Sequence, residues 1–130
     1  MSDPISDMLS RIRNAQMVKQ KTTNLPYSKM KLDIAEILVR EGFLIAVNKL
    51  GRKIDRTLEL VIKYEEDGSP KISEIKRISK PSQRVYMPYK ELHPLQGGLG
   101  RMILSTPLGL LTDREAKKKK VGGEILMEIW

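Results

Sequence analysis

Large apolar side chains recur at every second position of residues 58–64, and this pattern constrains the fold more than any other part of the sequence. Successive side chains of a strand point to opposite faces, so the alternation predicts a strand with one buried face. Such a strand needs other elements to cover its apolar side. The apolar positions are Leu58, Leu60, Ile62 and Tyr64.

Two earlier segments follow helical spacing instead. The first starts at Asp3-Pro4, an N-cap residue followed by a proline suited to the first helical position. The second follows Ser28, another N-cap candidate, and Gly42 is a suitable C-cap for it. The apolar positions of the two segments are Ile5, Met8, Leu9, Ile12 and Ala15, and Met30, Ile34, Ile37 and Leu38.

Helices and strands are mixed before the turn-rich segment Asp67–Pro70, and short strands dominate after it. The apolar run Phe43–Val47 adds a strand to the first part. Since Asp, Gly, Ser and Pro favour turns, this segment is the best candidate for a domain boundary. We therefore predict an α+β protein with two small domains. Residues 1–66 would form an N-terminal α/β domain with two helices packed on a short sheet, and residues 67–130 a mainly β domain with one short helix.

The C-terminal part contains a predicted turn, Ser105-Thr106-Pro107, after the short apolar strand Met102–Leu104. Its hydroxyls either bond to base edges and 2′-hydroxyls of RNA or belong to a plain connection between strands. Thr112 and Glu115 fit a capping box, which predicts a helix that starts there. That helix would end in a run of lysines, where the paired glycines 122 and 123 would stop it.

Further short strands are predicted on either side of these motifs. Arg84–Met87 is one, and Glu124–Trp130 is another with apolar residues on both faces. Between them, Pro88–Gly100 is rich in Pro and Gly and is expected to be irregular.

The charge of the chain favours a polyanionic partner. Lys and Arg total 24 against 16 acidic residues, which gives a net charge of +8 on 130 residues. Nucleic acid and anionic membranes both attract such a protein, but the longest apolar run is too short to span a bilayer, so no membrane partner is expected. The chain has no cysteine, which excludes disulfides and thiolate metal sites and suits a reducing compartment.

The sequence offers little for an enzyme. His93 is the only histidine and lies in a predicted loop without an evident partner. Gly98-Leu99-Gly100 lacks the third glycine of a dinucleotide-binding fingerprint. We therefore expect neither catalysis nor a cofactor or metal, which disfavours a nucleic-acid-processing enzyme.

Basic residues form three clusters suited to phosphates. The first runs from Lys76 to Arg84 and precedes Tyr86, whose ring either stacks on an exposed base or packs in the core. The second is Lys117–Lys120, which either binds phosphate or is a solvated helix end favoured by the helix dipole. The third comprises Arg11, Arg13 and the basic residues of 19–31, about half of which would be ordinary surface.

These motifs resemble those of a known family, the bacterial-type eighth protein of the small ribosomal subunit, nearly from end to end. Two features depart from the family pattern: Pro107 stands where a small hydroxyl residue is common, and Lys117–Lys120 is more basic than usual. The resemblance rests on Asp3–Ala15, Ile34–Leu38, Gly42-Phe43, Lys76–Pro81, Arg84–Tyr86, Ile103–Asp113, Gly122–Glu124 and Trp130.

The resemblance implies a structural constituent of the small ribosomal subunit that binds the central domain of its ribosomal RNA directly and supports assembly. Neighbouring small-subunit proteins would be further partners, in a cytoplasmic or organellar ribosome. Alternatively, the protein would repress translation of its own operon by binding a similar site on the messenger RNA. Together, the resemblance and the basic clusters predict RNA contacts at Arg84, Tyr86, Ser105, Thr106, Pro107, Lys118, Lys119, Lys120, Gly122, Gly123, Glu124, Lys29, Lys31 and Arg13.

Overall fold

The computed structural model describes residues 3–130, so the first two residues of the predicted N-terminal domain lie outside the described part. Within residues 3–130 the α-helices are α1 (Pro4–Met17), α2 (Lys29–Arg40) and α3 (Asp113–Lys119). The strands are β1 (Thr22–Pro26), β2 (Leu44–Leu50), β3 (Thr57–Ile62), β4 (Ile75–Arg77), β5 (Tyr86–Met87), β6 (Arg101–Thr106), β7 (Gly109–Thr112) and β8 (Gly123–Ile129). Short 3₁₀ helices occupy Lys53–Asp55, Tyr89–Glu91 and Gln96–Gly98. The predicted α+β class is confirmed.

The chain divides into two compact units. Residues 4–72 form the N-terminal unit, and Asp3 with Ser73–Trp130 forms the C-terminal unit. The sequence placed the domain boundary after residue 66, whereas the units separate between Ile72 and Ser73. The turn at Asp67–Pro70 therefore belongs to the N-terminal unit, where Tyr64 and Pro70 form an isolated antiparallel bridge.

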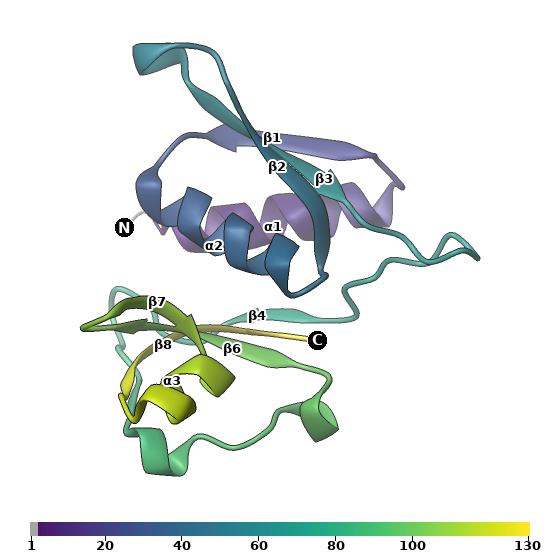
Figure 1. Cartoon of the computed structure of the whole chain (residues 1–130). Helices are drawn as coiled ribbons and strands as arrows, with labels where there is room; N and C mark the ends of the chain where they lie inside the picture. Colours follow the sequence, from purple (N-terminus) through teal and green to yellow (C-terminus); the bar gives the residue numbers. More distant parts are fainter. Residues whose placement is uncertain (1–2) are drawn as a thin grey trace. The chain divides into compact units, whose positions relative to one another are not determined.

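The N-terminal unit is built around the strand that the alternating pattern predicted. Its antiparallel sheet has the order β1-β3-β2, with β3 in the centre. Leu58, Leu60 and Ile62 are each at most 2% exposed, and α1 and α2 cover one face of the sheet (Figure 1). The predicted apolar stripe of α1 is also confirmed, since all five of its residues are buried.

The ends of α2 match the sequence signals, but its buried stripe differs from the prediction. Ser28 Oγ accepts a hydrogen bond from the Lys31 amide at 3.2 Å. At the other end Glu41 is the C-cap, and Gly42, the residue after it, has a φ of +85° that suits glycine. Met30 was predicted to be apolar core but is 44% exposed. The stripe instead begins at Lys31, one helical turn before Ile34, so helical geometry brings that lysine onto the buried face.

The C-terminal unit contains an antiparallel sheet of order β4-β8-β6-β7, and β5 pairs with β8 as well (Figure 1). Helix α3 contacts β6 and β7. The apolar residues between helix and sheet form one cluster: Leu92, Met102, Leu104, Leu111, Ala116 and Ile125. The predicted strands at 102–104 and 124–130 and the capping box of α3 are confirmed.

Three local predictions for this unit need correction. Ser105 and Thr106 are the last residues of β6, so the turn is only Pro107-Leu108, because pairing with β7 continues to Thr106. Helix α3 ends at Lys120 in the left-handed conformation, with φ 57°, and not at the glycines. Strand β5 begins at Tyr86, two residues later than predicted.

Among the described residues, no helix is long and apolar enough to cross a membrane.

Candidate nucleic-acid interface

Three predicted site residues form a row across the C-terminal sheet. Tyr86 of β5 pairs with Glu124 of β8, and Glu124 pairs with Ser105 of β6. Directly opposed residues of neighbouring strands share a face, so the three side chains lie next to one another. Tyr86 is 73% exposed, which removes the alternative that its ring packs in the core. We call this set the Tyr86–Glu124–Ser105 row.

A groove lies between β5 and the end of β6. It has a volume of about 480 Å³ and is lined by Tyr86, Met87, Pro88, Ser105, Thr106, Pro107, Gly122 and Gly123. We call it the β5–β6 groove. It unites the aromatic residue, the hydroxyl residues and the glycine pair that the sequence had proposed separately.

The glycines of the groove serve close approach of the backbone. A Cβ atom at Gly123 would lie 2.2 Å from the carbonyl oxygen of Ser105, and one at Gly122 would lie 2.5 Å from that of Met87. Atoms do not approach so closely, so a side chain at either position would push neighbouring strands apart. The sequence had interpreted this pair as a helix stop.

The two hydroxyls beside the groove differ in their bonding. Thr106 Oγ1 donates to the Gly109 carbonyl oxygen at 2.8 Å and accepts from the Leu108 amide at 3.0 Å. The Thr106 hydroxyl therefore fixes the hairpin turn. Ser105 Oγ has no hydrogen bond to any residue of the described range 3–130, so it can donate to or accept from a ligand.

Glu124 belongs to a polar cluster with the buried Ser79 and the exposed Arg84. Its Oε2 atom accepts hydrogen bonds from Ser79 Oγ at 2.5 Å and from Arg84 Nη1 at 2.9 Å. Burial alone would raise the pKa of Glu124, but these two hydrogen bonds and the positive charges of Arg84 and Arg77 outweigh it, so its pKa lies below the ordinary value. Glu124 is therefore ionised at neutral pH.

Ser79 is fully buried, and sequence reasoning missed it as a site residue. Its only local signal is a polar residue just before the Lys80-Pro81 turn, which carries no information about Glu124, 45 residues away. The structure also shows that Arg84 is ion-paired and does not stand as an isolated cation.

The lysines at the end of α3 differ from one another. Lys118, Lys119 and Lys120 are exposed, whereas Lys117 Nζ donates to the Leu92 carbonyl oxygen at 2.5 Å. The exposed lysines precede the groove residue Gly122 in the chain. They can therefore supply positive charge close in sequence to the groove.

The predicted contacts in the N-terminal unit have different environments. Lys29 is exposed and forms an ion pair with Asp33 at 2.7 Å. Lys31 is only 7% exposed, and burial lowers its pKa, so it is poorly placed for a phosphate. Arg13 is exposed on α1.

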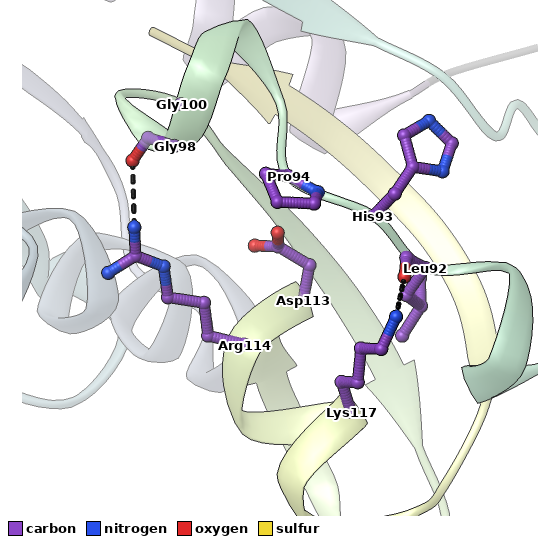
Figure 2. A pocket seen from close by; sticks show the side chains of 8 residues that line it. All are labelled: Leu92, His93, Pro94, Gly98, Gly100, Asp113, Arg114 and Lys117. Atoms are coloured by element: carbon purple, nitrogen blue, oxygen red, sulfur yellow. Dashed lines mark hydrogen bonds between the residues drawn. The ribbon is translucent and has the colours of Figure 1, made fainter.

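A second, smaller pocket of about 70 Å³ lies beside α3 (Figure 2). Arg114 donates to the Gly98 carbonyl oxygen at 2.9 Å, and Lys117 donates to the Leu92 carbonyl oxygen. Both cations therefore hold the irregular segment before β6 against α3. The ring of His93 points away from the pocket, and Nδ1 lies 2.9 Å from the Glu91 carbonyl oxygen (Figure 2). The described residues contain no group of three or more His, Cys, Asp or Glu that could hold a metal.

Comparison with known proteins gives consistent matches over the full length. The family model "Ribosomal protein S8" matches residues 3–130. The chain is 47% identical over 130 residues to the small ribosomal subunit protein uS8 of Leifsonia xyli, with 100% of this chain and 98% of the relative covered. It is 48% identical to the protein of that name from an Exiguobacterium species at the same coverage, and 44% identical to that of Trichormus variabilis, with 99% of this chain and 98% of the relative covered.

Proposed function

Because this chain belongs to the ribosomal protein S8 family of the small ribosomal subunit, we propose that it binds the ribosomal RNA of that subunit directly through the β5–β6 groove. The family consists of ribosomal proteins and not of enzymes, in agreement with the prediction from the sequence. The RNA target is a helical, internally looped region in the central domain, and binding supports assembly of the subunit. Neighbouring small-subunit proteins are further partners.

The observation that carries the proposal is the Tyr86–Glu124–Ser105 row beside the groove. An exposed aromatic ring offers a face on which an unstacked base can lie. The unbonded hydroxyl of Ser105 can contact a base edge or a 2′-hydroxyl. Only RNA carries the 2′-hydroxyl, so the second contact would distinguish RNA from DNA. The glycine pair leaves the groove without side chains at its centre, so the RNA can approach the backbone.

Positive charge supports binding without specifying sequence. Lys118, Lys119 and Lys120 are exposed and can neutralise phosphates next to the groove residues. In the N-terminal unit, Arg13 and Lys29 are the exposed cations of the predicted set. We do not include Lys31, because the residue is only 7% exposed.

The proposal is tested by titrating the pure protein with a central-domain RNA fragment and with random RNA of equal length. Tyr86→Ala should weaken binding of the fragment by about 1–3 kcal/mol, or roughly 5- to 150-fold, through lost base stacking. Ser105→Ala should also weaken it, because RNA polar groups lose their partner. Binding of random RNA should change little.

Leu99→Ala and Ser73→Ala are matched controls, since both positions are exposed in the same unit and neither lines the groove. Thermal melts of each variant come first, so that unfolding is not mistaken for lost binding. Equal losses on both RNAs, or no loss on either, would refute a sequence-selective role of the groove.

Repression of the protein's own operon is a second proposal, and it uses the same groove. The row and the groove would recognise a local RNA structure, so a messenger that folds into the same structure would compete for them. Competition between the ribosomal fragment and the operon messenger for one binding site tests this. Simultaneous binding of both RNAs, or Tyr86→Ala affecting only one of them, would contradict it.

A further inference from the structure

Building on the RNA-binding function proposed above, we propose that Glu124 determines specificity at the centre of the Tyr86–Glu124–Ser105 row. Its carboxylate neutralises Arg84 and disfavours phosphate at this point. Binding then depends on base and hydroxyl contacts more than on charge.

The carboxylate of Glu124 is held in one position. Ser79 Oγ and Arg84 Nη1 both bond to the same oxygen, Oε2, and the side chain of Glu124 is only 11% exposed. Oε1 accepts no hydrogen bond from any residue between 3 and 130. An ionised carboxylate only accepts hydrogen bonds, so Oε1 suits an amino or imino group of a base and repels a phosphate oxygen.

The segment that carries Arg84 is fixed at its base by Ser79. Besides its bond to Glu124, Ser79 Oγ accepts a hydrogen bond from the Val85 amide at 3.0 Å. Lys80 and Gln83 exchange two backbone hydrogen bonds, of 2.9 and 3.0 Å, and so close a tight loop above Ser79. Ser79 is thus a positioning residue that keeps the Arg84 guanidinium within reach of Glu124.

Arg84 is the cation of this cluster that could turn toward RNA. Arg77 also lies near Glu124, but its side chain is 10% exposed and bonds to Asp3 at 3.1 Å and to the Leu126 carbonyl oxygen at 2.7 Å. The Arg84 side chain is 57% exposed. While it is paired with Glu124, the pair carries no net charge, so contact with a phosphate brings little counterion release.

The test measures dissociation constants between 50 and 200 mM salt for random RNA and for the central-domain fragment. Glu124→Gln keeps the size of the side chain but releases Arg84. The slope of log affinity against log salt for random RNA should steepen by about 0.7–0.9. The ratio of the variant's affinity to the parent's affinity should then be about threefold larger at 50 mM than at 200 mM salt. The preference for the fragment over random RNA should fall, because the released Arg84 binds phosphates of any RNA and the carboxylate no longer favours a base at Oε1.

The double variant Glu124→Gln/Arg84→Ala removes both charges of the pair, so it should keep the parent's random-RNA slope and abolish the effect of Glu124→Gln. Glu91→Gln is the matched control, since it makes the same change of charge at an exposed position of the same unit that does not line the groove, and it should not alter the slope. All variants are first checked by thermal melting.

Two results would overturn the proposal. If Glu124→Gln folds and leaves both slope and preference unchanged, Glu124 is only structural. If the double variant flattens the random-RNA slope by about 0.7–0.9 relative to the parent, Arg84 is an ordinary phosphate ligand in the parent protein, and this result decides even if Glu124→Gln alone does not fold. A parent protein without preference for the fragment would refute the proposed function instead, and the random-RNA slopes would still decide the role of Glu124.

Discussion

Replacing Gly123 by alanine should open the C-terminal sheet beside the groove. The added methyl group would lie 2.2 Å from the Ser105 carbonyl oxygen and 3.0 Å from Thr106 Cγ2. The closest of these atoms belongs to the backbone, so no side-chain rotation can relieve the overlap. Strands β6 and β8 must separate by about 1 Å before methyl and oxygen reach van der Waals contact.

The cost follows from what this separation disrupts. The backbone hydrogen bonds between β6 and β8 beside Ser105 and Glu124 weaken, which costs about 1–2 kcal/mol in total, and overpacking adds about 1–2 kcal/mol. The total is about 2–4 kcal/mol, a large share of the roughly 5–15 kcal/mol by which small proteins are stable. For a unit of this size the melting temperature should fall by roughly 10–30 °C.

Urea denaturation followed by tryptophan fluorescence measures this cost, because Trp130 is the only tryptophan and belongs to the C-terminal unit. Gly100→Ala is the control: its methyl would lie 3.0 Å from the Ile129 carbonyl oxygen, so a shift of a few tenths of an ångström suffices. It should cost about 1 kcal/mol or less. The reasoning fails if Gly123→Ala costs no more than Gly100→Ala.

Three further predictions concern charge, pH and capping. Lys118→Ala and Lys119→Ala should each flatten the salt dependence of log affinity by about 0.7–0.9 for matched and mismatched RNA alike, and unchanged slopes would make them solvated residues only. Lys120→Gly tests the third lysine without straining its left-handed backbone. Because the pKa of Glu124 is lowered in the folded protein, its stabilising contribution is complete above the pKa of the unfolded chain and is lost as the pH falls through the folded value. Glu124→Gln should therefore weaken the acid dependence of the unfolding free energy, and an identical pH profile in urea titrations would contradict this. Ser28→Ala should cost about 1 kcal/mol, since the Lys31 amide loses its cap, and denaturation curves that coincide with the parent's would count against it.

The sequence predicts elements well where one local pattern decides them. The alternation at Leu58–Ile62 and the stripe of α1 each identify a buried face, and Thr112 with Glu115 forms the predicted capping box. Such patterns depend only on residues within one or two turns or one strand. They are therefore readable without knowledge of the tertiary structure.

The candidate site needed information that no local pattern contains. The row exists because β8 lies between β5 and β6 in a register that aligns Glu124 with both Tyr86 and Ser105. Sequence indicates which faces are apolar, but not which strands are neighbours. The burial of Ser79 depends on the same pairing and could not be predicted.

The central place of β8 in the sheet has a consequence for biosynthesis. β8 pairs with β4, β5 and β6, so the C-terminal sheet cannot be completed until residue 129 has been translated. The N-terminal unit is complete at Ile72 and can fold first on the nascent chain. The edges of β4 and β6 that await β8 are exposed to wrong pairing during that interval. The proposed RNA-binding groove therefore forms only after β8 has been translated.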